Sequence, residues 1–216
     1  MISLKLQAYN TIKQKILSCE YPPNSLLNEE KLREDLQVSR TPIRDALSRL
    51  EQESLIQILP KRGVIVAGIS LEEVEQIYEL RMLIEPHALE KYGKTINTDV
   101  YEKLAGFFSQ NPKKFTVDEI YKKDDEFHHL FINAAKNTYL TQAYRYPYTQ
   151  NIRLRILSGN LGKQRIEQSQ QEHGVITRYC LNKSWKKAAN SLRGHLLRSK
   201  EISYSVITQL KILLHR

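Results

Sequence analysis

One acid and three histidines in the second half of the chain have a spacing suited to metal binding. Asp124 and His128 are four residues apart, so a helix places both side chains on one face. His173 and His195 each share a helical stripe with apolar residues, which predicts that they point into a core. One divalent cation, such as Zn²⁺, Ni²⁺ or Mn²⁺, would pair with all four groups. The alternative is a set of core histidines with ordinary hydrogen-bond partners, and the spacing alone leaves both interpretations open.

A basic segment nearer the N-terminus, Val38–Leu50, is typical of a helix that docks on nucleic acid. Its apolar residues recur at helical spacing and predict one buried stripe. The opposite face is rich in arginine, whose planar fork of donors suits phosphates and the edges of guanine. Ser39 is predicted to cap the helix. The residues predicted to contact DNA from this segment are Ser39, Arg40, Thr41, Arg44 and Arg49.

The elements around this segment predict a winged helix-turn-helix over residues 5–67. An amphipathic helix precedes it, and Asn28 is placed to cap a short second helix that leads into it. Two β-rich runs follow, at 56–59 and 64–67, with a hairpin loop between them. The loop residues predicted to form the tip of a DNA-binding wing are Lys61, Arg62 and Gly63. This order of elements predicts binding to double-stranded DNA.

The rest of the chain predicts an all-α bundle, so the fold class is mainly α. The domain boundary is expected between residues 1–69, the DNA-binding domain, and residues 70–216, a domain for ligand and metal binding and for dimerisation. Capping boxes begin at Ser70 and Thr116. The helices of the second domain are predicted at 71–92, 98–109, 116–136, 138–157, 163–181 and 184–214.

The composition limits which partners and which cellular setting fit this chain. The net charge of +9 favours a polyanionic partner, although residues 1–69 hold 10 Lys and Arg against 8 Asp and Glu. Most of the cationic excess therefore lies outside the predicted DNA reader. Cys19 and Cys180 are the only cysteines, which fits a reducing, cytoplasmic setting. No signal-peptide core and no membrane-spanning apolar run is present, so no membrane partner is expected.

The N-terminal motifs resemble the winged helix-turn-helix of GntR-type bacterial transcription regulators. The matching segments are Leu27–Leu32, Val38–Leu47, Arg49–Glu51 and Lys61–Val64. Three positions depart from the family pattern. Gln37 and Asn24 stand where the family usually has glycine, and asparagine also tolerates the left-handed backbone angle. Glu30 stands where some members carry a DNA-contacting cation, which puts that contact in doubt.

The C-terminal motifs resemble the FCD effector domain of the FadR-type branch of that superfamily. The matching segments are Arg81–Glu85, Asp124–His128, Glu172–His173 and Gly194–Leu196. The resemblance implies that Asp124, His128, His173 and His195 hold a divalent metal, which helps to bind a small organic acid. It also implies a homodimer that binds a short inverted-repeat operator. The arginines expected to hold the carboxylates of the effector are Arg81, Arg153 and Arg155. The alternative for each of them is a surface salt bridge, and the sequence does not choose between the two.

A metal-dependent enzyme domain fused to a DNA-binding module is the alternative from a different class. Glu126 or Glu172 would then act as a general base beside a metal-bound water. Helical spacing points both carboxylates away from the metal face, and the chain has no nucleophile elbow or phosphate-binding glycine loop. The sequence therefore favours a ligand-responsive transcription regulator over an enzyme.

Overall fold

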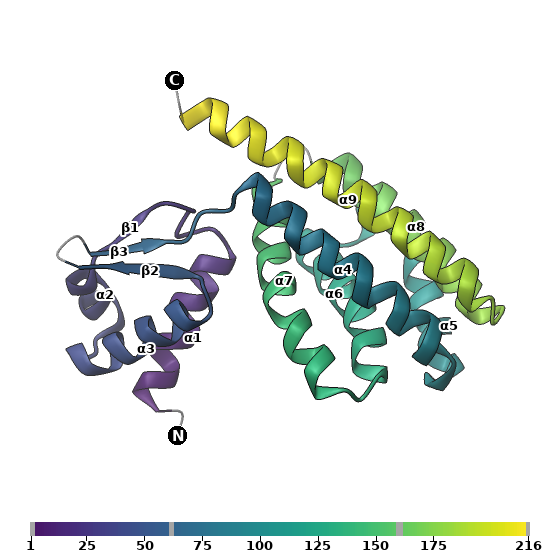
Figure 1. Ribbon diagram of the computed structural model, residues 1–216, viewed down its shortest axis with the longest axis horizontal. Coiled ribbons are helices and arrows are strands. Elements are labelled where there is room, and N and C mark those ends of the chain that lie inside the picture. The colour runs from purple at the N-terminus through teal and green to yellow at the C-terminus, as the bar shows by residue number, and fades with distance from the viewer. Residues whose placement is uncertain (1–2, 61–62, 159–161, 215–216) are drawn as a thin grey trace. The chain divides into compact units, whose positions relative to one another are not determined.

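The computed structural model describes residues 3–60, 63–158 and 162–214 (Figure 1). The chain divides into two compact units. One comprises Met1–Ser70 together with Thr149–Leu157, and the other comprises Leu71–Tyr148 and Ser158–Arg216. Each unit is described by itself.

The N-terminal unit is built from three helices and a small sheet. The helices are α1 (Leu4–Leu17), α2 (Glu29–Leu36) and α3 (Arg40–Gln52). The strands are β1 (Leu26–Leu27), β2 (Ile56–Leu59) and β3 (Gly63–Val66), and β3 pairs antiparallel with both of the others. The stripe predicted on α3 is buried together with α1 and the sheet, in a core that includes Ile12, Ile16, Ile43, Leu47, Leu50 and Val64. The predicted winged helix-turn-helix is confirmed, and β1 is an addition to it.

Local side-chain chemistry explains most of the turns in this unit. Asn28 Oδ1 accepts hydrogen bonds from the backbone N–H groups of Glu30 and Lys31, so the predicted cap of α2 is confirmed. Asn24 and Gln37 both adopt positive φ angles, 66° and 52°, at the positions where the resemblance leads one to expect glycine. Ser39 precedes α3 with extended backbone, but its side chain makes no capping hydrogen bond, so that prediction was wrong. Its φ and ψ of −72° and 176° suit an N-cap, and only the hydroxyl contact is missing.

Six further helices make up most of the described residues after position 70. They are α4 (Leu71–Tyr92), α5 (Thr98–Phe108), α6 (Val117–Ala134), α7 (Thr138–Leu157), α8 (Gly162–Leu181) and α9 (Trp185–Leu214), with short 3₁₀ turns at Gly93–Thr95 and Pro112–Lys114. Thr116 and Glu119 form the predicted capping box of α6. The predicted all-α architecture is thus confirmed.

The helices of the C-terminal unit pack so that three of them surround one region of the core. Helix α9 runs along α4 and also packs against α8, and α4 contacts α6 (Figure 1). The candidate metal ligands therefore come from α6, α8 and α9, while α4 supports them from one side. Within the described residues, no helix is both long enough and apolar enough to span a membrane.

Candidate metal centre and nucleic-acid interface

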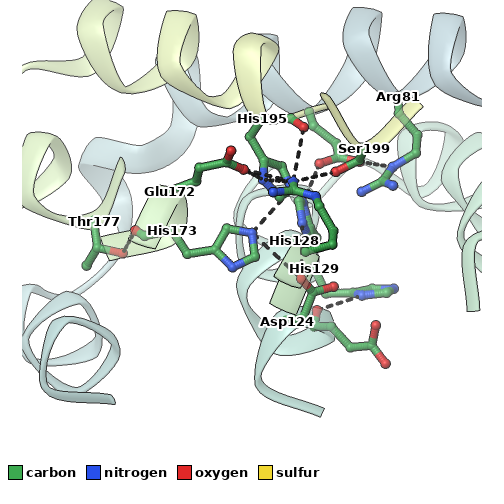
Figure 2. A network of polar contacts seen from close by, with 12 residues as sticks. Arg81, Asp124, His128, His129, Glu172, His173, Thr177, His195 and Ser199 are labelled. Atoms are coloured by element: carbon green, nitrogen blue, oxygen red, sulfur yellow. Dashed lines mark hydrogen bonds and ion pairs between the residues drawn. The ribbon is translucent and has the colours of Figure 1, made fainter. Parts of the chain in front are cut away.

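The structure brings together the four residues predicted to bind metal. Asp124 and His128 project from α6, His173 from α8 and His195 from α9 (Figure 2). One ring nitrogen from each histidine lies within 4.8 Å of the other two. The distance between His173 Nε2 and His195 Nε2 is 3.3 Å. Asp124 Oδ1 lies 3.7 Å from His173 Nε2 and 4.0 Å from His128 Nε2. The three histidines are at most 3% exposed, so the cluster is enclosed.

A buried carboxylate on α4 fixes the orientation of the His128 ring. Glu85 Oε2 lies 2.6 Å from His128 Nδ1. Glu85 Oε1 accepts hydrogen bonds from Arg81 Nε at 2.5 Å and from the Tyr144 hydroxyl at 2.9 Å. Burial opposes the charge of Glu85, but Arg81 and His128 outweigh it and hold its pKa at about 2. Glu85 accepts a hydrogen bond from Nδ1–H, which turns Nε2 of His128 toward Asp124.

A second carboxylate, on α8, does the same for His195. Glu172 Oε2 lies 2.7 Å from His195 Nδ1. Arg165 Nη2 donates to Glu172 Oε2 and to Ser199 Oγ, both at 2.8 Å, and Arg198 Nε donates to Glu172 Oε1 at 2.5 Å. Burial works against the charge of Glu172, but His195 and Arg165 outweigh it and lower its pKa to about 2.

The tautomer of His195 follows from these contacts. Arg165 Nη2 also lies 3.1 Å from His195 Nδ1, but an imidazole nitrogen cannot both accept from arginine and donate to a carboxylate. The shorter contact, to an ionised Glu172, is the stronger one, so Nδ1 carries the proton. Burial lowers the pKa of His195 to about 4, so the ring is neutral near pH 7 and Nε2 carries a lone pair.

His173 is held differently from the other two histidines. Its ring lies 4.3 Å from the ring of Phe127 and 5.1 Å from the ring of Phe108, measured between ring centres. Burial lowers the pKa of His173 well below its usual value, so this ring is neutral as well. Aromatic packing therefore orients His173, whereas carboxylates orient His128 and His195.

These donors fit a divalent metal. Three imidazoles and one carboxylate turn nitrogen and oxygen atoms toward one another inside a nearly sealed core, an arrangement that a cation stabilises. Donor atoms about 2.0–2.1 Å from one ion lie roughly 3–4 Å from each other, as His173 Nε2 and His195 Nε2 do. Two of the imidazoles also give their second nitrogen to a carboxylate, which is the usual arrangement of histidine ligands. A metal bound here would supply a positive charge and coordination positions for an anion.

The arginines expected to bind an effector are distributed over both units. Arg81 is 2% exposed and paired with Glu85 in the C-terminal unit. Arg153 is fully buried in the stretch of α7 that groups with the N-terminal unit, where it donates to Gln150 Oε1 at 2.8 Å and to the carbonyl of Ala67. Arg155 belongs to the same stretch and is half-buried. Sequence reasoning missed Glu85 and Arg165, although the spacing of four between Arg81 and Glu85 was a signal for the first.

The two carboxylates considered as general bases do not face the metal-binding atoms. Glu172 contacts the Nδ1 side of His195, opposite its Nε2 atom. Glu126 is exposed and pairs with Lys123. Neither of these two carboxylates therefore lies among the metal-facing atoms of the cluster.

The predicted DNA-binding face of α3 is exposed. Ser39, Arg40, Thr41, Arg44 and Arg49 are all accessible, and Gly63 lies exposed at the start of β3 with a φ of 99°. The side chain of Arg44 is 70% exposed, with Nε 3.7 Å from Glu29 Oε2. Arg49 instead lies over the ring of Tyr9, 3.9 Å from its centre. Lys61 and Arg62, the predicted wing tip, lie outside the described residues. The basic face of α3 is therefore free to meet a duplex, with Arg44 as its most accessible measured cation.

Comparison with known proteins finds two family models, which match consecutive parts of the chain. The model of the gntR family of bacterial regulatory proteins matches residues 4–66, and the model of the FCD domain matches residues 76–198. The HTH-type transcriptional regulator YdhC of Bacillus subtilis is 26% identical over 194 residues, which cover 88% of this chain and 86% of that protein. The gluconate operon transcriptional repressor of Bacillus licheniformis is 29% identical over 60% of this chain, and the match spans about half, 54%, of that protein.

Solved structures show the same fold. The crystal structure of a transcriptional regulator GntR from Rhodococcus sp. RHA1 superposes with a TM-score of 0.79, at 15% identity, over 93% of this chain and 97% of that one. At this identity the likeness concerns the fold alone. The matched domains and relatives are those of transcription regulators rather than enzymes.

Proposed function

Because the chain belongs to the gntR family of bacterial transcription regulators and carries an FCD domain, we propose that it is a metal-assisted, ligand-responsive repressor or activator that binds its operator as a homodimer. The observation that carries the proposal is the pairing of an exposed basic helix with an enclosed three-histidine cluster in one chain. The proposal, which follows the FadR-type branch, places the protein in the cytoplasm with the bacterial chromosome.

The DNA-binding part of the proposal concerns the exposed face of α3. In a symmetric dimer, two such helices would enter successive major grooves of a short inverted repeat, with the wings beside the backbone. Arg40, Thr41 and Arg44 are the side chains best placed on α3 to reach bases or phosphates. A single bidentate contact between arginine and guanine contributes about 1–3 kcal/mol to discrimination against the wrong base.

Arg44→Ala tests this part. The operator is first selected from a pool of randomised duplexes with the unaltered protein, and affinities are then compared at matched salt. Arg44→Ala should weaken binding by about 5- to 150-fold per half-site. Arg193→Ala, which removes an exposed arginine from α9, is the matched control and should bind as the unaltered protein does. Equal affinity of the Arg44→Ala variant and the control would refute the proposed docking face.

The metal part of the proposal assigns Asp124, His128, His173 and His195 as ligands of one divalent ion. Elemental analysis of the double variant His173→Ala with His195→Ala should find no bound metal. His87→Ala removes an exposed histidine of α4 outside the cluster and should retain full metal content. Full metal content in the double variant would mean that the ligand set is misassigned. Which of Zn²⁺, Ni²⁺ and Mn²⁺ is bound is read from the same measurement.

The effector part of the proposal is a small carboxylate bound beside the metal. The predicted contacts are Arg81, Arg153 and Arg155, and an open coordination position would accept a carboxylate oxygen. By linkage, effector and operator would change each other's affinity by the same factor, with a coupling of about 1–3 kcal/mol. A thermal-shift screen of gluconate, lactate, malate and citrate tests this part. An acid that raises the melting temperature of the metal-loaded protein, but not of protein treated with a chelator, supports the proposal. An equal rise with and without the chelator counts against it.

A further inference from the structure

Two carboxylates, on α4 and α8, each accept a hydrogen bond from a histidine of the cluster. We infer that Glu85 and Glu172 are positioning residues of the metal centre, with Arg81 and Arg165 holding their carboxylates in place. The inference rests on the proposed metal site and deepens it. It also gives Arg81 a role that does not require contact with an effector.

Metal binding by a histidine requires one particular tautomer of its ring. A histidine binds metal through a nitrogen that carries no proton, so the proton must sit on the other nitrogen. Glu85 and Glu172 accept hydrogen bonds from Nδ1 of His128 and His195 at 2.6 Å and 2.7 Å. Nε2 of His128 is therefore turned toward Asp124, and Nε2 of His195 toward His173, before any metal binds. A ring without such a partner would divide its proton between the two nitrogens.

The two carboxylates are themselves held by guanidinium groups. Glu85 is fully buried, and the side chain of Glu172 is 16% exposed. A polar group at such a depth is stable only where hydrogen bonds hold it. Arg81 stands against Glu85 on the same helix, one turn away, while Arg165 and Arg198 enclose Glu172. The guanidinium groups thus act on the metal centre through the carboxylates.

Each of the two carboxylates lies on a different helix from the histidine that it contacts. Glu85 projects from α4 and reaches a histidine of α6, whereas Glu172 projects from α8 and reaches a histidine of α9. Each hydrogen bond therefore links two helices as well as setting a tautomer. Tyr144 adds a third helix, α7, to the contacts of Glu85. A change in the helix packing would alter the metal ligands through these links, and occupancy of the metal site would in turn stabilise the packing.

A matched acid elsewhere in the same unit provides the control. Glu75 also lies on α4 and accepts hydrogen bonds from a cation and a tyrosine, Lys200 Nζ at 2.5 Å and the Tyr204 hydroxyl at 2.7 Å. It contacts no histidine of the cluster. Glu75→Gln therefore removes an ion pair between α4 and α9 without touching the metal centre. Any general loosening of the bundle should appear in this variant, whereas a specific loss of ring orientation should not.

The test is the affinity for Zn²⁺, measured in the full-length protein by competition with a chromogenic chelator. Glu85→Gln and Glu172→Gln should each lower the affinity by about 10- to 100-fold, and Glu75→Gln should leave it within about twofold. Co²⁺ should also give an altered visible absorption spectrum in the first two variants, because the ligand field follows ring orientation. Equal affinity in all four proteins, or an equal loss in Glu75→Gln, overturns the inference. Failure of the unaltered protein to bind Zn²⁺ or Co²⁺ overturns the proposed metal site itself.

A second variant separates positioning from folding at the buried pair. Glu85→Gln leaves the Arg81 charge without its carboxylate, so this variant alone is expected to be unstable. The double variant Arg81→Met with Glu85→Gln removes both charges and should recover the melting temperature of the metal-free protein. Its affinity for Zn²⁺ should stay low, because the carboxylate that orients His128 is still missing. Recovery of the affinity together with the stability would overturn the inference.

Discussion

Arg44 and Arg49 lie on the same helix and are both predicted to contact DNA, but their surroundings predict opposite effects of substitution. The side chain of Arg44 is 70% exposed and has one long contact, 3.7 Å, to Glu29. The guanidinium of Arg49 covers the ring of Tyr9 at 3.9 Å, with Nε 3.9 Å from Glu53 Oε1. We therefore expect Arg49→Ala to destabilise the N-terminal unit and Arg44→Ala to leave its stability unchanged.

The size of the effect follows from these contacts. A half-exposed cation such as Arg49 contributes about 0.5–1 kcal/mol over an aromatic ring, and an exposed ion pair adds about 0–1 kcal/mol. Glu53 keeps its hydrogen bonds from the Tyr9 hydroxyl, at 2.6 Å, and from Lys13 when Arg49 is removed, so no buried charge is left without a partner. The expected loss for Arg49→Ala is about 0.5–2 kcal/mol. For Arg44→Ala it is within about 0.5 kcal/mol of zero.

Hydrogen exchange measured by mass spectrometry resolves the amides of α1 and α3 from those of the C-terminal unit. Arg49→Ala should speed exchange in these two helices by about 2- to 30-fold, and Arg44→Ala should not change it. In operator titrations over a salt series, the larger loss of affinity should belong to Arg44→Ala. Unchanged exchange in Arg49→Ala, together with a salt slope reduced by about one, would refute the reasoning. Arg49 would then be engaged with phosphate rather than with Tyr9.

Three further predictions concern single residues. Gln37→Gly should stabilise the N-terminal unit by about 0.5–1 kcal/mol, because Gln37 has a φ of 52°; an unchanged or lower thermal midpoint would contradict this. In the native protein a thiol reagent at pH 8 should label Cys19 slowly and leave Cys180 unmodified, since burial raises the pKa of Cys180 to about 12, and labelling of both at equal rates would contradict it. In metal-free protein, Trp185 fluorescence should show the C-terminal unit losing stability as pH falls from about 4.5 toward 2, because the pKa of Glu85 is about 2 in the folded state and higher in the unfolded one. A Glu85→Gln variant should lack the Glu85 contribution to that fall.

Short-range chemistry explains why the helices were predictable. Asn28 caps α2, and Thr116 with Glu119 begins α6, through contacts that span only two or three residues. The burial of His128, His173 and His195 follows from their place on apolar stripes, because helical periodicity depends on the chain alone. The family motifs, which are stretches of consecutive residues, were equally visible in the sequence.

Other features depended on contacts between distant parts of the chain. Strand β1 has only two residues, too few for an alternating pattern, and exists because it pairs with β3. Helical spacing correctly placed Glu172 off the metal face, yet nothing in the sequence indicated that it would meet His195, 23 residues away. Arg49 looked equivalent to Arg44 until the packing of α1 against α3 brought Tyr9 beneath it.

The sequence by itself determined which residues form helices, which faces of those helices are buried and which side chains are candidates for binding metal or DNA. These properties depend on neighbours within a turn or two of the chain. Only the tertiary structure decided which nitrogen of His128 and of His195 is presented to a metal, because Glu85 and Glu172 reach those rings from other helices. The direction and depth at which two helices pack depend on side chains far apart in the sequence, so the protonation of the metal-binding rings is a property of the folded bundle.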